Sequence, residues 1–445
     1  MKYRLKYRAD VPRPNTFEER MVTYGFEWTF LFYLFGALYI VGPVIGWTLA
    51  AWTLCLWISG WVTGEDRVRI PLGVWVWAAA MAVMLLTLLV AHFDYSLGIA
   101  KTIKSSIGWA KGWALLAVFP LIGCLRLRPE LIYRAASKVS VQALVLLPLM
   151  AIAARVGVPD VLYVSPLKVV GGPGPEFFAL RLYSLEPGNE LRYWLFTPWA
   201  PALGFIANVY FVLVLRDPDL RWRIAGSIGA LAMIFASGSR LGLVALVVVQ
   251  GMSWALIGLF QPIKWLLGGI STLIFGVLFT FLQNFAADFM HKFHAARADS
   301  SRVRAALGRI AMRRWQEEAP VWGHGIVERG PHLVEYMPIG SHHTWYGVLF
   351  VKGAVGFYAL LFAMAWSFLD LLIKAQWNRE AQAGFGVVLV LFMYSFGENL
   401  EILSYLFWPG LVVMGLGFNA GFRGSQHGPA IPRPRTEGDP ATCSA

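Results

Sequence analysis

The sequence predicts an all-α polytopic membrane protein. Apolar residues make up 57% of the 445 residues and charged residues only 14%, whereas soluble globular proteins contain about 25% charged residues. Runs of roughly 20 apolar residues recur along the chain, and a run of that length crosses a bilayer as a helix. These observations exclude a soluble globular fold and predict about twelve transmembrane helices with a large, partly helical outer loop.

The predicted organisation alternates short polar connections with these helices. Residues 1–25 are the N-terminal segment, 26–283 hold spans one to nine with an outer loop at about 155–191, and 284–343 are the large outer loop. Residues 344–420 hold the last three spans, and 421–445 are a disordered tail rich in Pro, Gly and charge. The spans lie at about 26–41, 44–62, 72–91, 107–125, 135–154, 192–215, 222–237, 240–259, 263–282, 344–373, 383–397 and 402–420.

The first pair of spans comes from one long apolar run, which we divide at Gly42-Pro43 because proline interrupts helical hydrogen bonding. The basic residues support the resulting orientation, with both termini in the cytoplasm. The segments on that side carry most of them, and positive charge favours the inner side of a membrane. The formal charge of +12 therefore reflects topology and predicts no nucleic-acid partner. The three cysteines, Cys55, Cys124 and Cys443, suggest neither a disulfide nor a metal site.

Arg240 is the first candidate for a functional residue. It follows Ser237-Gly238-Ser239 at the predicted outer end of the eighth span. One interpretation is an interfacial anchor whose side chain reaches the lipid headgroups. The other is an anion site, because a guanidinium donates two hydrogen bonds to a phosphate and the small residues beside it allow close approach.

The large loop contains a predicted amphipathic helix that begins at Asp299 or Ser300 and ends near Glu318. At 100° per residue, Arg302, Arg309 and Arg313 share one face, and Val303, Leu307 and Ile310 share the neighbouring face. Such a helix is expected to lie on the outer leaflet. Its arginines attract anionic headgroups, or Arg302 joins Arg240 around a lipid-linked diphosphate.

The pair His342-His343 stands where the large loop meets the tenth span. Imidazole titrates near neutral pH, so either histidine could act as a general base or orient a hydroxyl group. The alternative is a hydrogen-bonded interfacial histidine without a role in chemistry. Glu398, in the short outer turn before the last span, and Arg181, in the first outer loop, are accessory candidates together with Arg309 and Arg313.

Three motifs in this order resemble the O-antigen ligase and the O-antigen and exopolysaccharide polymerase superfamily. Ser239-Arg240-Leu241-Gly242 is similar to the arginine motif that opens a membrane helix in that family. Ser300-Ser301-Arg302 with Ala319-Pro320-Val321-Trp322-Gly323-His324-Gly325 is similar to its large periplasmic loop. His342-His343-Thr344-Trp345 with Gly353-Ala354-Val355-Gly356 is similar to its histidine followed by two spaced glycines. The family has one histidine where this chain has two, so the choice between His342 and His343 stays open.

The resemblance implies an inverting, metal-independent glycosyltransferase of the bacterial inner membrane that needs no cofactor. Its donor would be a glycan on undecaprenyl diphosphate, held by Arg240 and Arg302, and its acceptor hydroxyl would be positioned or deprotonated by His342 or His343. A polymerase extends a lipid-linked glycan, and a ligase transfers it to lipid A–core or another anchor. The stretch from Glu328 to Trp345 favours a polymerase by its likeness to exopolysaccharide polymerases.

A membrane transporter or a lipid-linked glycan flippase is the alternative from another functional class. Such proteins commonly have repeated halves and charged residues near the middle of the membrane. The sequence shows no repeat, and most of its ionisable residues fall near the predicted outer surface. The pattern therefore favours the enzyme.

Overall fold

The computed structural model describes residues 11–64, 68–186, 190–259, 261–280, 283–284 and 298–421. This part of the chain is mostly helical. Six of its helical segments are long and apolar enough to cross a membrane, which is consistent with the predicted all-α membrane protein. Three shorter apolar helices accompany them. The prediction of twelve spans stays a prediction, and residues 422–445 of the predicted tail lie outside the described residues.

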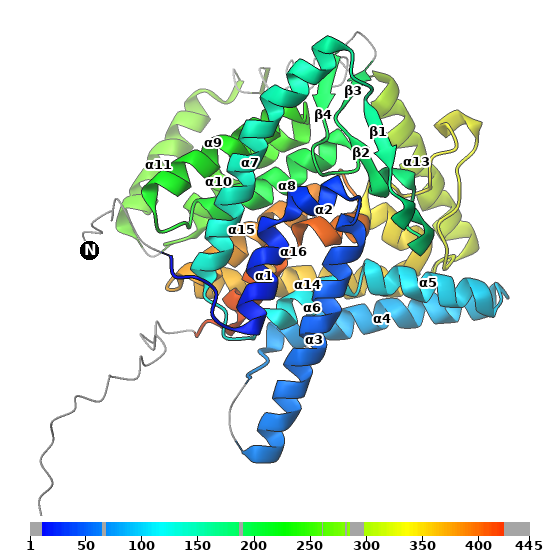
Figure 1. Ribbon diagram of the computed structural model, residues 1–445, viewed down its shortest axis with the longest axis horizontal. Coiled ribbons are helices and arrows are strands. Elements are labelled where there is room, and N and C mark those ends of the chain that lie inside the picture. The colour runs from blue at the N-terminus through cyan, green and yellow to red at the C-terminus, as the bar shows by residue number, and fades with distance from the viewer. Residues whose placement is uncertain are drawn as a thin grey trace, which may run out of the picture.

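The N-terminal helices are α1 (Phe17–Glu27), α2 (Thr29–Leu34), α3 (Leu38–Thr63), α4 (Leu72–Asp94), α5 (Ile99–Lys111), α6 (Leu115–Ile122) and α7 (Pro129–Val156). The central helices are α8 (Ala200–Val214), α9 (Leu220–Ala236), α10 (Arg240–Leu256) and α11 (Pro262–Val277). The C-terminal helices are α13 (Ala298–Glu318), α14 (Thr344–Ala375), α15 (Arg379–Tyr394) and α16 (Leu400–Asn419). Figure 1 shows α16 in the middle of the molecule, with α4 and α14 side by side beneath it.

The predicted division at Gly42-Pro43 is wrong, because α3 runs through Pro43 without a break. The chain turns instead at Gly36, whose φ of 62° is left-handed. A Cβ on Gly36 would lie 2.7 Å from the carbonyl oxygen of Phe178, so a contact with a distant segment fixes this turn. The chain still reverses direction here, since α1 and α3 run antiparallel (Figure 1).

The segment predicted to be the first outer loop contains two small antiparallel hairpins that were not predicted from the sequence. Strand β1 (Val161–Val164) pairs with β2 (Ala179–Arg181), and β3 (Tyr183–Glu186) pairs with β4 (Glu190–Tyr193). Two short 3₁₀ helices, η1 (Pro166–Val170) and η2 (Pro175–Phe178), connect β1 to β2. The span predicted to begin at residue 192 therefore begins only at Ala200, after strand β4.

The core surrounds α16, most of whose residues are buried. Phe205 of α8 stacks on Tyr394 of α15 at 4.5 Å between ring centroids and packs on Phe407 of α16 at 5.1 Å. At the other extreme, no residue of α11 is buried by the described part of the chain. In a membrane its apolar surface would face lipid.

Helix α13 ends at Glu318, as predicted, and begins at Ala298, one residue before the predicted start. The side chains of Asp299, Ser300 and Ser301, and hence the predicted helix cap, lie outside the described residues. Its apolar face packs on protein rather than facing an outer leaflet as expected. Val303 and Leu307 pack against Val334 of η3 (His332–Val334), and Ala311 packs against Ile339 and Phe350.

Helix α14 is broken at Gly353, whose φ of 64° and ψ of −167° are not helical. In an unbroken helix the amide of Ala354 would bond to the carbonyl of Phe350. Instead the Ala354 amide donates to Pro320 at 2.9 Å, and the Phe350 carbonyl accepts from the His324 amide at 2.9 Å. Val355 and Val351 are paired in the same way, with Val321 at 3.2 Å and Gly325 at 3.0 Å. The segment 320–325 is thus inserted into the hydrogen bonding of α14.

Replacing Gly353 by Ala tests this insertion. The added Cβ would lie 2.2 Å from the carbonyl oxygen of Val321, at a φ that L-residues avoid. We expect Gly353→Ala to destabilise the protein by about 1–3 kcal/mol or more, seen as a lower unfolding temperature in detergent. The matched change is Gly269→Ala in α11, where no described atom lies within 4 Å of the added Cβ. Equal unfolding temperatures for the two variants would contradict the insertion.

Candidate functional site

The start of α14 is tied to the turn between α15 and α16. The Thr344 amide donates to the carbonyl of Ser395 at 2.9 Å. The Thr344 hydroxyl donates to the carbonyl of Glu398 at 2.7 Å and accepts from the amide of Leu400 at 3.1 Å. Because Thr344 follows the two histidines directly, these bonds hold His342 and His343 close to Glu398.

His342 is half-buried. Burial lowers the pKa of His342 to about 4, and the positive charge of Arg304 lowers it further in the same direction. The imidazole is therefore neutral at neutral pH, with one nitrogen that donates and one that accepts a hydrogen bond. Such a ring can orient a hydroxyl group, but a conjugate acid with a pKa near 4 makes it a weak general base.

His343 has a structural role at the start of α14. It is the N-cap of α14, and its Nδ1 accepts a hydrogen bond from the amide of Tyr346 at 3.4 Å. Its ring stacks on Tyr346 at 4.0 Å and meets the edge of Phe396 at 5.7 Å. Burial lowers the pKa of His343 to about 4. These contacts engage His343 as a helix cap and leave His342 as the better candidate for contact with a substrate.

Glu398 is a buried carboxylic acid in the α15–α16 turn, with 1% of its surface exposed. Its Oε2 accepts a hydrogen bond from the indole nitrogen of Trp199, the N-cap of α8, at 3.0 Å. Burial raises the pKa of Glu398 to about 7, although Arg304 and Trp199 act in the opposite direction. A carboxyl group that titrates near neutral pH at such a place has the properties of a general base.

Arg304 of α13 is the cation whose charge acts on both His342 and Glu398. Arg304 was not predicted from the sequence, where the arginine face formed by Arg302, Arg309 and Arg313 was the more prominent pattern. Two residues along a helix are about 200° apart, so Arg304 lies almost opposite Arg302. It shares its side of the helix with Gly308, where an added Cβ would lie 2.9 Å from the Tyr346 ring.

The face that was predicted to bind anions is exposed. Arg302, Arg309 and Arg313 are all solvent-exposed, and Arg313 lies 3.9 Å from Glu317 in a pair with both side chains largely in water. Arg304 is also solvent-exposed, and it differs from these three arginines in the side of α13 on which it lies.

Arg240 opens α10, as predicted. Ser239 is the N-cap and accepts a hydrogen bond from the Gly242 amide at 3.1 Å. The next residue, Leu241, contacts the α15–α16 turn, since a Cβ on Gly397 would lie 2.4 Å from Leu241 Cδ2. The arginine motif and the turn that carries Glu398 therefore contact each other. The contact is between Leu241, the neighbour of Arg240, and Gly397, the neighbour of Glu398.

Arg192 of β4 is a second buried arginine beside this motif, and the sequence analysis missed it. It is 4% exposed, and a Cβ on Gly238 would lie 3.2 Å from Arg192 Nε. Gly238 has a left-handed φ of 57°, so the lack of a side chain there both permits the turn and makes room for the guanidinium. To predict a buried Arg192 from the sequence, one would first have had to recognise strand β4, in which side chains alternate between two faces.

Arg181, by contrast, belongs to strand β2 of the two hairpins. Its guanidinium lies 3.3 Å from Asp160 and 4.2 Å from the centre of the Trp194 ring. Its amide donates to the Tyr33 hydroxyl at 2.8 Å. These contacts connect the two hairpins to α2, and they account for Arg181 as a structural residue.

The electrostatics of the region favour an anion. The N-termini of α8, α10, α14 and α16 meet there through Trp199, Leu241, Thr344 and Glu398, and the positive end of a helix dipole lies at its N-terminus. Arg192, Arg240 and Arg304 add positive charge. In the part of the chain that the structure describes, no group of three His, Cys, Asp or Glu residues could hold a metal ion. Metal independence itself stays a prediction.

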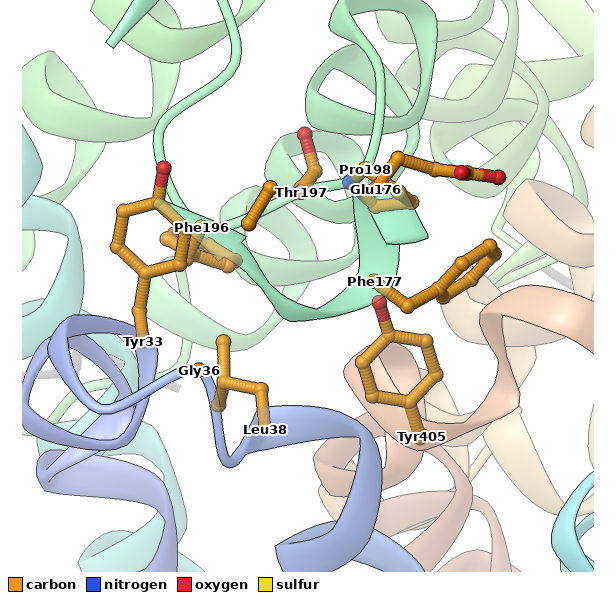
Figure 2. Close-up of a pocket in the computed structure, with 10 residues that line it drawn as sticks. Tyr33, Gly36, Leu38, Glu176, Phe177, Phe196, Thr197, Pro198 and Tyr405 are labelled. Atoms are coloured by element: carbon orange, nitrogen blue, oxygen red, sulfur yellow. The ribbon is translucent and has the colours of Figure 1, made fainter. Parts of the chain in front are cut away.

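An enclosed cavity lies at one side of this region, between α2, η2 and α16. Tyr33, Glu176, Phe177, Thr197 and Tyr405 are among the side chains that line it (Figure 2). Its volume of about 10 Å³ is close to the minimum for one water molecule. It is therefore no binding site for a glycan or a lipid.

Comparison of the chain with protein-family models and with curated proteins gave no match. The family suggested by the three motifs therefore remains a resemblance.

Thr344 allows a test of the geometry that does not depend on any activity. Thr344→Val removes the hydroxyl and leaves the buried amide of Leu400 without its acceptor, which costs about 1–3 kcal/mol. Thr344→Ser keeps the hydroxyl and should lose much less. We expect thermal unfolding in detergent to rank the stabilities as wild type, Ser, then Val. A Val variant as stable as the Ser variant would argue against the tie between α14 and the α15–α16 turn.

Proposed function

We propose that this protein transfers a glycan from a polyprenyl diphosphate to an acceptor hydroxyl at the outer face of the bacterial inner membrane. The observation that carries the proposal is the meeting of Glu398, His342 and Arg304 at the N-termini of several helices. In this arrangement the carboxyl group of Glu398, which titrates near neutral pH, lies in a region of positive charge. A base for the acceptor and a cradle for a departing diphosphate are the two things this reaction needs.

In the proposed reaction, Glu398 accepts the proton of the acceptor hydroxyl. The acceptor oxygen forms a bond to the anomeric carbon, and the bond from that carbon to the diphosphate oxygen breaks. Inversion follows from attack on the side opposite the leaving group. The polyprenyl diphosphate departs with the bonding electron pair, and Arg240, assisted by Arg304 and the buried Arg192, stabilises the negative charge that grows on it.

The role of His342 in this proposal is to orient the acceptor. Its conjugate acid is stronger than that of Glu398, with a pKa of about 4 against about 7. The Glu398 carboxylate is therefore the stronger base of the two. Sequence reasoning assigned the base to a histidine because free imidazole titrates near neutral pH. Burial lowers the pKa of His342 and raises the pKa of Glu398, so here the carboxyl group titrates near neutral pH and the imidazole does not.

The acceptor determines which enzyme of the class this is. We propose a polymerase, which extends a lipid-linked glycan, on the likeness of residues 328–345 to exopolysaccharide polymerases. A ligase, which transfers the glycan to lipid A–core or a similar anchor, uses the same donor chemistry. Transport of a lipid-linked glycan is the third outcome of the experiment below.

The first experiment measures the lengths of surface and lipid-linked glycans in a strain that lacks the gene. Complementation with wild type should restore long chains, and Arg240→Ala, His342→Ala and Glu398→Gln should not, although all three variants remain in the membrane. For Glu398→Gln we expect a rate loss of about 10²- to 10⁴-fold, the usual contribution of a general base.

The glycans of the deletion strain separate the alternatives. Single repeat units in place of long chains indicate a polymerase, and long chains that remain on the carrier indicate a ligase. Glycan that accumulates only on the cytoplasmic side indicates transport. That result, or activity that survives all three substitutions, would overturn the proposal.

The pH dependence of transfer tests the electrostatic link to Arg304. Glu398 acts when ionised, so activity should rise with pH through about 7. The charge of Arg304 lowers the pKa of Glu398, and Arg304→Gln should therefore raise it and move the rise in activity upward by up to about one pH unit. Arg313→Gln, a change on the exposed face of α13, should leave the profile in place. A shift of equal size in both variants would contradict the link.

A further inference from the structure

Helix α5 lies at the periphery of the described structure. Together with α6 it forms one of the six candidate spans, Ile99–Ile122, yet none of its own residues is buried by the described part of the chain. It packs beside α4, and Figure 1 shows the turn that joins these two helices at the edge of the molecule. One side of α5 therefore faces the surroundings of the protein.

The opposite side of α5 is held to α4. The indole nitrogen of Trp109 donates to the carbonyl of Met81 at 3.0 Å, and the hydroxyl of Ser105 lies 3.0 Å from Nε2 of His92. Residues four apart in a helix are separated by about 40° around its axis. Trp109 and Ser105 therefore mark one narrow side of the helix, and they fix which residues point outward.

The outward side of α5 carries an apolar stripe. Ile99, Ile103 and Ile107 follow each other at intervals of four residues and are 80%, 56% and 51% exposed. They cover a sector of about 80° around the helix axis. Contact with the chains of membrane lipids removes such a stripe from water and is therefore favourable.

A basic stripe lies directly next to the isoleucines. Lys101 and Lys104 are exposed, and Lys104 lies about 60° around the axis from Ile107. Residues 95–111 include three lysines and no acidic residue. Two like charges one turn apart repel each other, and a lysine that faces lipid is costly unless its ammonium reaches the headgroups. An anionic group between the two lysines relieves both costs.

The C-terminal end of α5 lies against the candidate site. The helix ends at Gly112, where an added Cβ would lie 2.6 Å from Cγ of Glu401. Glu401 is in the first turn of α16, three residues after Glu398. Lys111, the last residue of α5, donates to the carbonyl of Gly171 at 2.9 Å. The surface of α5 thus begins at the edge of the molecule and ends about one helical turn of α16 from the proposed base.

We propose that the outward side of α5 is a docking surface for the lipid-linked diphosphate, with the polyprenyl chain along the isoleucines and the diphosphate on Lys101 and Lys104. The identity of this occupant rests on the proposed function. A soluble sugar phosphate lacks a chain for the apolar stripe, and a neutral lipid lacks a charge for the basic one. Phosphatidylglycerol brings a single negative charge to the two lysines, whereas the diphosphate brings one for each.

The first test captures the lipid that lies on α5. The full-length protein with Ile103→p-benzoylphenylalanine is placed in nanodiscs of phosphatidylcholine and phosphatidylglycerol that contain a small fraction of undecaprenyl diphosphate. After irradiation, mass spectrometry should find undecaprenyl diphosphate on residue 103 well above its share of the bilayer. The matched position is Ile58 of α3, which is 55% exposed, and its adducts should follow the composition of the bilayer.

Two paired substitutions assign the enrichment to the lysines. Lys101→Gln with Lys104→Gln should lower it by up to about fivefold for each lysine, the effect of one basic residue at an anionic membrane surface. Lys101→Arg with Lys104→Arg should preserve it. Enrichment at residue 103 no higher than at residue 58, or unchanged in the glutamine pair, would overturn the proposal. An equal enrichment of phosphatidylglycerol would do the same.

Transfer kinetics separate this inference from the proposed function. Docking away from the reacting atoms contributes equally to the ground state and the transition state, so the glutamine pair should raise KM for the lipid-linked donor and leave kcat unchanged. Arg155→Gln, which removes an exposed cation in the last turn of α7, should change neither. An unchanged KM in the glutamine pair contradicts the docking surface alone. Enrichment at residue 103 in a protein that performs no transfer contradicts the proposed function alone.

Discussion

The arrangement of α13, α14 and the segment between them depends on where the backbone amides and carbonyls beside Gly353 find hydrogen-bond partners. An unpaired amide or carbonyl in the apolar part of a membrane costs several kcal/mol, and the break exposes four such groups. The segment 320–325 pairs with all four, through Pro320, Val321, His324 and Gly325. Part of the segment predicted to be the large outer loop therefore belongs to the hydrogen bonding of a long apolar helix.

This constraint extends to the candidate site. Because Glu318 bonds to His324, the end of α13 is fixed to the inserted segment, and the rest of α13 lies along α14. Thr344 then fixes the start of α14 to the turn that carries Glu398. Two of the motifs that were noticed separately in the sequence, around Pro320 and around Gly353, thus turn out to contact each other directly.

The sequence predicted the features that depend on local periodicity. The apolar runs gave most helices to within a few residues, and the end of α13 at Glu318 followed from its amphipathic pattern. The errors fall where a distant contact decides. Pro43 suggested a break, but the chain turns at Gly36 because Ser165 and Phe178 approach its backbone. The short strands of Arg181 and Arg192 pair with β1 and β3, and Tyr33 of α2 bonds to Arg181; no local sequence pattern marks these strands.

The residues of the candidate site could likewise be predicted only in part from the sequence. The sequence could select Arg240, His342, His343 and Glu398 as residue types in predicted outer positions, and the structure bonds Thr344, which follows the histidines, to the carbonyl of Glu398. It could not select Arg304, because the choice among the arginines of one helix depends on which side of that helix faces His342 and Glu398. Nor could it show that His343 is a helix cap, since capping is a property of backbone geometry.

The position of Arg304 has a consequence for how a bound anion would act. Its charge lowers the pKa of both His342 and Glu398, and a diphosphate beside Arg304 would offset that charge. Both groups would then hold protons more strongly while the donor is bound. For Glu398 this means a stronger base with a smaller ionised fraction near neutral pH, and the two effects oppose each other in the rate. In the proposed reaction, the same shift would help Glu398 to keep the proton taken from the acceptor, until the diphosphate left and Arg304 again favoured the carboxylate.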